Sequence, residues 1–212
     1  MNWKDIPIPA RMRRLERDRR GLPIPFLVVR DPTHGTPHFT INDSRKHFQC
    51  LSEDRCAICG DHLHRGRWFV GGPLSAFHPN GAYVDTPTHD ECCHYALQVC
   101  PYLAAPKYSG RLDDATFDYQ ANPDVVMFLD PTMIPERPPV FCAVMAVGQA
   151  VWRNGPSICV KPHMPYRKVE FWRHGQQIEN DEGRQITMQM LERADKIERK
   201  PPRIIPRPQS PF

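Results

Sequence analysis

The sequence predicts an α+β protein with short strands, few helices and proline-rich loops. Short apolar runs that are typical of strands occur in both halves of the chain. Residues 181–200 instead repeat apolar side chains every three or four positions, which is typical of a helix. The 24 prolines among 212 residues are about twice the average share, and proline interrupts long regular elements.

The N-terminal segment 1–21 is rich in arginine, and we expect it to form a basic arm. Arginine binds phosphate through a planar, permanently charged guanidinium. The candidate nucleic-acid contacts are therefore Arg11, Arg13, Arg14 and Arg17. A solvated, partly helical arm is the alternative interpretation. A net charge of +4 allows nucleic-acid contact without demanding it.

Local signals predict a hairpin and a short helix after the arm. The runs 26–30 and 38–41 have strand-like composition, and the segment between them is rich in turn-forming residues. Asp43 or Ser44 is a good N-cap for a helix that continues to about Ser52. This helix leads the chain into its most informative stretch.

Two pairs of metal-binding residues predict a structural zinc site. Cys56 and Cys59 are two residues apart and precede Gly60, which suits a tight turn with both sulfurs pointing inward. His89 and Cys92 lie three positions apart, so the first turn of a helix places them on one face. Four such ligands satisfy the tetrahedral preference of Zn²⁺ and leave no open position.

The helix that carries the second pair has its own start signal. Thr88 and Glu91 fit a capping box, in which each side chain bonds a backbone N–H of the other residue. The fourth ligand is open to an alternative, because Cys93 lies four residues from His89 and could bind instead of Cys92. Two histidines just after the first pair are reserve ligands: His62 and His64.

The stretch resembles a treble-clef zinc finger of the HNH-like type. We expect the runs 67–70 and 82–84 to pair as the hairpin between the two ligand pairs. HNH nucleases, which share this arrangement, need a base histidine at the end of the first hairpin strand, where this chain has none. His78, Asn80 and His94 are present but do not stand in the family's order.

A wider resemblance covers roughly the first half of the chain. Segments 6–12 and 20–25 and the block that runs from 69 through 101 resemble those of uncharacterised zinc-motif proteins of bacteria and their phages. The resemblance implies a small cytosolic protein of mobile-element origin with a zinc motif, and it supplies no activity. Because a closed ligand set makes the zinc structural, we expect a binding module with a regulatory or accessory role that contacts nucleic acid or a host protein. The alternatives are an HNH-type metal-dependent nuclease and a protein-only inhibitor or adaptor.

The second half predicts a sheet covered by a helix. Four apolar runs have the composition of strands in one antiparallel sheet: 125–129, 140–147, 158–160 and 169–172. The helix over 181–200 has one apolar stripe, which we expect to pack on that sheet. We thus divide the chain into a basic arm (1–21), a hairpin and zinc domain (22–105), a sheet with its helix (106–200), and a proline-rich tail (201–212).

Composition also indicates where the protein works. The sequence has no long apolar run that would cross a membrane and no secretory signal at its polar N-terminus. We therefore expect a cytoplasmic protein, in the host cytoplasm if a phage encodes it. In that compartment its eight cysteines are reduced thiols, some of them on metal.

Overall fold

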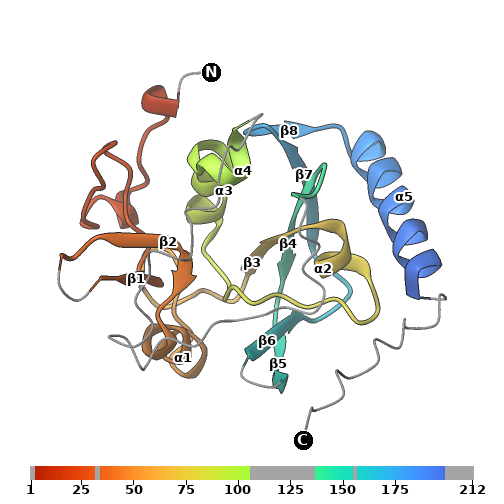
Figure 1. Cartoon of the computed structure of the whole chain (residues 1–212), viewed down its shortest axis with the longest axis horizontal. Coiled ribbons are helices and arrows are strands. Elements are labelled where there is room, and N and C mark those ends of the chain that lie inside the picture. The colour runs from red at the N-terminus through yellow and green to blue at the C-terminus, as the bar shows by residue number, and fades with distance from the viewer. Residues whose placement is uncertain (1–2, 32–33, 106–136, 155–156, 199–212) are drawn as a thin grey trace, which may run out of the picture.

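The computed structural model describes residues 3–31, 34–105, 137–154 and 157–198, and it confirms the α+β class (Figure 1). The predicted strand over 125–129 and the tail 201–212 lie outside the described residues. Of the helices that the structure describes, none combines the length and the apolarity that a membrane crossing requires.

A four-stranded antiparallel sheet forms the centre of the molecule. Its strand order is β3 (Arg67–Gly71), β4 (Phe141–Ala146), β7 (Lys168–Arg173) and β8 (Gln176–Ile178). Side chains of β4 are almost completely buried, since this strand is internal and both of its faces are covered. This explains why 140–147 reads as a continuous apolar run in the sequence.

The two faces of the sheet carry two separate cores. On one face Phe69, Val144 and Phe171 pack with Ala76 of α2 (Pro73–Phe77), and Ile186 of α5 (Asn180–Glu198) lies against this cluster. Alternate residues point the other way, because successive strand side chains face opposite sides. On that second face the strands pack against α3 (Asp90–Val99) and α4 (Pro101–Ala104) through these residues: Trp68, Phe141, Ala143, Trp172, Cys93, Leu97 and Leu103.

Helix α5 approaches the sheet very closely at Gly183. A Cβ atom at this position would lie 2.1 Å from Cγ of Phe171, far inside van der Waals contact. Only glycine therefore allows the helix to lie this close to β7. The result agrees with the prediction that the C-terminal helix packs on the sheet, and Figure 1 shows α5 on the side of the sheet opposite α3.

The described residues of segment 3–52 form a smaller layer beside the sheet. Strands β1 (Val28–Arg30) and β2 (Pro37–Asn42) form the predicted antiparallel hairpin. Helix α1 (Ser44–Ser52) follows, and the Asp43 side chain caps it by accepting hydrogen bonds from two backbone N–H groups. The hairpin and α1 predictions are confirmed. The arm before them contains two short 3-10 turns, η1 (Trp3–Asp5) and η2 (Ala10–Met12).

Two pairing predictions are wrong. Strand β3 does not pair with 82–84; it pairs along its length with β4, while Trp68 makes one isolated bridge to Thr88 and Tyr83 makes another to Val160. The run 158–160 belongs to β6 (Ser157–Pro162), which pairs with β5 (Gln149–Asn154) in a separate ribbon. Strand composition indicates an extended segment but does not identify its partner.

Candidate metal centre

The four predicted zinc ligands converge in the interior. One donor atom from each of Cys56, Cys59, His89 and Cys92 lies within 4.8 Å of the other three, and all four residues are at most 2% exposed. In a tetrahedral site with Zn–S of about 2.3 Å and Zn–N of about 2.0 Å, ligand atoms are about 3.5 to 3.8 Å apart. The Cys59 Sγ to His89 Nδ1 distance of 3.3 Å is close to that range. The cluster could therefore hold a zinc ion.

Backbone hydrogen bonds build the turn that presents the two cysteines. The Cys56 N–H donates to the Asp61 carbonyl at 2.8 Å, and the Gly60 N–H donates to the Cys56 carbonyl at 2.9 Å. Gly60 has a φ of +76°, a conformation that glycine adopts without strain. A third bond, from Ala57 N–H to the Pro87 carbonyl, joins this turn to the segment that precedes α3.

His89 is held so that one ring nitrogen faces the thiols. Its Nε2 lies 2.9 Å from the His62 carbonyl, an acceptor, so Nε2 carries the proton and Nδ1 is left with a lone pair. Metal-binding histidines usually have such a second hydrogen bond, which fixes the ring and its tautomer. The His89 backbone N–H also lies 3.5 Å from Cys56 Sγ, as expected for a donor beside a thiolate.

The predicted capping box is wrong by one residue. Helix α3 begins at Asp90 with His89 as its N-cap, and the His89 side chain caps no N–H of this described helix. Thr88 instead donates its hydroxyl to the Trp68 carbonyl at 3.3 Å, while Glu91 pairs with Arg11. The His89 ring faces the cysteine thiols. The N-cap residue is therefore a candidate metal ligand, and its side chain does not cap the helix.

The reserve ligands lie outside the cluster. Cys93 is fully buried among Trp68 and Leu97 on the sheet side of α3, and burial raises the pKa of its thiol. His62 contributes its carbonyl, and its ring bonds the Glu53 carbonyl. The His64 ring lies 2.9 Å from the Arg11 guanidinium. The geometry therefore brings together Cys92 rather than Cys93 with the other three residues.

The Cys56 and Cys92 thiols share one buried space, so the pKa of each depends on the other. Burial raises the pKa of Cys56, but hydrogen bonds from Cys59, Cys92 and the backbone outweigh it and lower the pKa to about 3. The same interactions with Cys56 and Cys59, followed by burial, raise the pKa of Cys92. The two thiols therefore influence each other's ionisation, and zinc binds cysteine in its thiolate form.

The basic arm lies on the cysteine turn. Met12 is 2% exposed and packs in one cluster with Cys56, Cys59 and Cys92. Arg11 forms an ion pair of 2.6 Å with Glu91, and this hydrogen bond raises the arginine's pKa. The arm therefore covers the metal centre on the side away from the sheet.

The four arginines predicted to contact nucleic acid have different environments. Arg14 donates to the Cys59 carbonyl and to Asp61, and Arg11 is held by Glu91. Arg17 is exposed and makes only a long bond, 3.4 Å, to the Gly21 carbonyl. Arg13 is exposed, and its side chain has no partner among the described residues. Arg13 and Arg17 are thus the two members of the set that remain available to a ligand.

One polar cluster near the candidate metal ligands was not predicted from sequence. His94 belongs to α3. Its Nε2 lies 2.7 Å from Glu170 Oε2, and its Nδ1 lies 2.8 Å from the Asp90 carbonyl oxygen. The Trp172 indole N–H also donates to Glu170, at 3.1 Å. This network ties the metal-binding helix to β7. Its two halves are 76 residues apart, so no local sequence signal could connect them.

The histidines that an HNH nuclease would use are not assembled with a metal site. His78 accepts a hydrogen bond from the Asn80 backbone N–H, and His94 is engaged with Glu170. Within the described residues, the group formed by Cys56, Cys59, His89 and Cys92 is the one cluster that could hold a metal.

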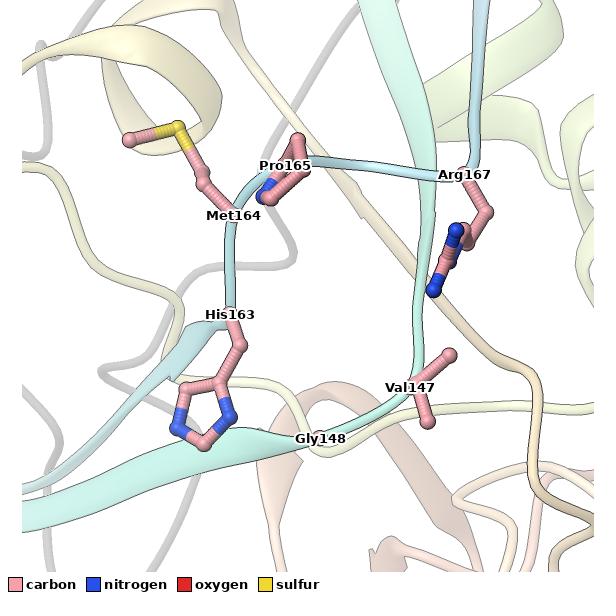
Figure 2. A pocket seen from close by; sticks show the side chains of 6 residues that line it. All are labelled: Val147, Gly148, His163, Met164, Pro165 and Arg167. Atoms are coloured by element: carbon pink, nitrogen blue, oxygen red, sulfur yellow. The ribbon is translucent and has the colours of Figure 1, made fainter.

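Two surface depressions lie away from the metal centre. One of about 270 Å³ is lined by residues 177–180. The other, of about 220 Å³, lies between residues 147–148 and 163–167, with the side chains of His163 and Arg167 on opposite sides of it (Figure 2). None of the four candidate zinc ligands lines either depression, so neither depression would give a substrate access to the metal.

Comparisons with known proteins give no relative from which a role could be transferred. No family model matches the chain, and neither a curated protein nor a solved structure matches it significantly. The functional argument therefore depends on the residues themselves.

Proposed function

We propose that this chain is a binding module in which a structural zinc ion supports an arginine-rich arm that contacts nucleic acid. The observation that carries the proposal is the closed ligand set of Cys56, Cys59, His89 and Cys92, which is buried and supplied entirely by side chains. Zinc with four protein ligands stabilises a fold, whereas catalytic zinc keeps a position for water or substrate. An accessory role in binding therefore fits this centre better than hydrolysis.

The position of the arm supports nucleic acid as the ligand. Burial of Met12 and the ion pairs of Arg11 and Arg14 fix the arm on the zinc unit. A fixed arm presents the exposed charges of Arg13 and Arg17 without the entropy cost of ordering a loose segment. We also propose the cytoplasm as the place of action, because a reducing compartment keeps thiols free to bind metal.

A host protein is the second candidate partner. Strand β5 exposes apolar side chains that a partner could cover, with Val151 at 47% and Trp152 at 39% exposure. A module of this second type would bind no nucleic acid at low salt and would co-purify with a protein.

The experiment measures binding of a labelled oligonucleotide by fluorescence anisotropy at several salt concentrations. The test variant replaces Arg13 and Arg17 by glutamine, which removes two exposed charges and leaves the ion pairs of Arg11 and Arg14 intact. Each phosphate contact contributes roughly 0.7 to 0.9 to the slope of log K against log salt. We expect weaker binding and a slope that is smaller by about 1.4 to 1.8.

The matched control replaces Arg184 and Arg193, two exposed arginines of α5, by glutamine. The control changes net charge equally on the side of the molecule opposite the arm (Figure 1). If the control pair flattens the slope as much as the arm pair does, the arm is not the contact surface. Absence of binding by the zinc-loaded wild type at low salt would refute nucleic acid as the ligand.

A further inference from the structure

The arm contacts the β1–β2 hairpin as well as the zinc unit, because its second half lies on that hairpin. Glu16 forms an ion pair of 2.9 Å with Arg30 of β1, and the Arg17 backbone bridges to Pro23. The Arg20 guanidinium lies over the ring of Phe39 on β2, 5.4 Å from its centroid. The turn of residues 16–20 is therefore held against the hairpin at both of its ends.

This arrangement places an exposed aromatic ring against an arginine of a basic turn. Phe39 is 36% exposed and lies under the Arg20 guanidinium, and the same turn carries two further exposed arginines, Arg17 and Arg19. Asp18 is the one acid between them, and it is turned inward, with a side chain that is 6% exposed and paired with Arg20. We call Arg17, Arg19, Arg20 and Phe39 the arm–hairpin surface.

A planar cation over an aromatic ring is a platform of the kind on which a nucleobase stacks. Bases offer a π-face to aromatic rings and to guanidinium planes, while arginines beside the platform neutralise the phosphates. Such stacking requires an unpaired base, because the faces of bases inside a duplex are already covered by their neighbours. A surface of this type therefore discriminates by strandedness rather than by sequence.

We infer that the nucleic acid bound by this protein is single-stranded, and that Phe39 with Arg20 stacks against one of its bases. The inference rests on the proposed function and names the ligand class of the same arm. Other exposed aromatics, such as Phe48 and Trp152, have no arginine over the ring in the described structure. Phe39 is the exposed ring that the arm itself adjoins.

The test compares three fluorescent probes with zinc-loaded protein: oligo(dT), oligo(U) and a duplex of the same length. We expect both single strands to bind more tightly than the duplex. The variant Phe39→Leu, which keeps apolar bulk but removes the ring, is expected to weaken single-strand binding by about tenfold or more. The salt slope should stay unchanged, because no phosphate contact is lost. Phe39→Trp should retain the affinity.

Trp152→Leu is the matched control, since this exposed ring lies on β5, away from the arm (Figure 1). Zinc content and circular dichroism establish that each variant is folded. The inference would be overturned if duplex and single strands bound with equal affinity and Phe39→Leu did not change that affinity. The proposed function would still hold in that case. Failure of all three probes to bind at low salt would overturn both.

Discussion

One nitrogen of the Arg14 guanidinium donates to both the Cys59 carbonyl, at 2.7 Å, and the Asp61 carboxylate, at 2.5 Å. Arg14 thereby connects the arm to the backbone of the metal-binding turn. Its side chain is 59% exposed, so the ion pair is partly screened by solvent. The bond to the carbonyl adds a geometric constraint that an ordinary surface ion pair does not have.

Arg14→Ala should lower the free energy of unfolding of the zinc-loaded protein by about 1 kcal/mol, since it removes one ion pair and one charge-assisted hydrogen bond. Urea unfolding measures the loss. The neighbouring Arg13→Ala is the control and should be neutral, because Arg13 has no side-chain partner in the described structure. Equal losses in the two variants would contradict a specific role for Arg14.

Metal analysis tests the ligand set directly. We expect about one zinc per chain in native protein. Cys92→Ala should lose the metal on dialysis against a chelator, because one of four donors is removed, whereas Cys93→Ala should retain it. The loss should also lower stability markedly, since structural zinc contributes roughly 10 to 16 kcal/mol in small zinc-binding peptides. Zinc retained by Cys92→Ala but lost by Cys93→Ala would reverse the assignment.

Glu170 provides a comparison between a buried and an exposed ion pair. Its side chain is 12% exposed and accepts from His94 and Trp172. Glu170→Ala leaves both donors without their acceptor and should cost about 2 to 4 kcal/mol. Glu182 pairs with Arg173 at 2.6 Å but is 44% exposed, so Glu182→Ala should cost less than about 1 kcal/mol. Similar losses in the two urea titrations would show that burial is not decisive here.

Gly183→Ala should destabilise the protein although it occurs within a helix. Alanine favours a helix over glycine by about 1 kcal/mol, which predicts stabilisation. The added methyl group would collide with Phe171, however, and overpacking of this kind costs about 1 to 3 kcal/mol. Thermal unfolding should therefore show a lower midpoint, while the exposed Gln185→Ala should leave it nearly unchanged. An increase for Gly183→Ala would mean that α5 can move away from the sheet.

His47 should make stability depend on pH. Burial lowers the pKa of this histidine, although its hydrogen bond to the Val84 carbonyl and the nearby Asp85 charge oppose the shift. The unfolded chain then binds the proton more readily than the folded protein does. The free energy of unfolding should therefore fall as the pH drops below about 6.5.

The measurement compares urea unfolding at about pH 7.5 and at about pH 5.5 for wild type and for His47→Gln. Glutamine retains a donor for the Val84 carbonyl but does not titrate. We expect the variant to lose less stability between the two conditions. Equal losses would indicate that His47 binds its proton as easily in the folded protein as in the unfolded chain.

Local sequence patterns predicted the helices and strands themselves better than they predicted which strands pair with each other. The Asp43 cap was readable because its hydrogen bonds are made within three residues. The ligand spacing was readable because each pair lies on one turn of chain. The pairing of β3 with β4 joins distant segments, and nothing in either strand's composition specifies it. Strand β5 was missed because its described side chains are largely exposed and lack an apolar alternation.

The ladder between β3 and β4 joins the metal-binding half of the chain to the C-terminal half over five residue pairs, from Arg67↔Ala146 to Gly71↔Cys142. Trp68 and Phe69 enter opposite cores of the sheet from this single strand. A chain cut between positions 106 and 136 would therefore yield two pieces that complement each other rather than two autonomous folding units. Expressed alone, the first piece would have an open strand edge at β3, and Trp68 and Phe69 would lose the contacts that β4 and β7 provide. We therefore expect this piece to aggregate.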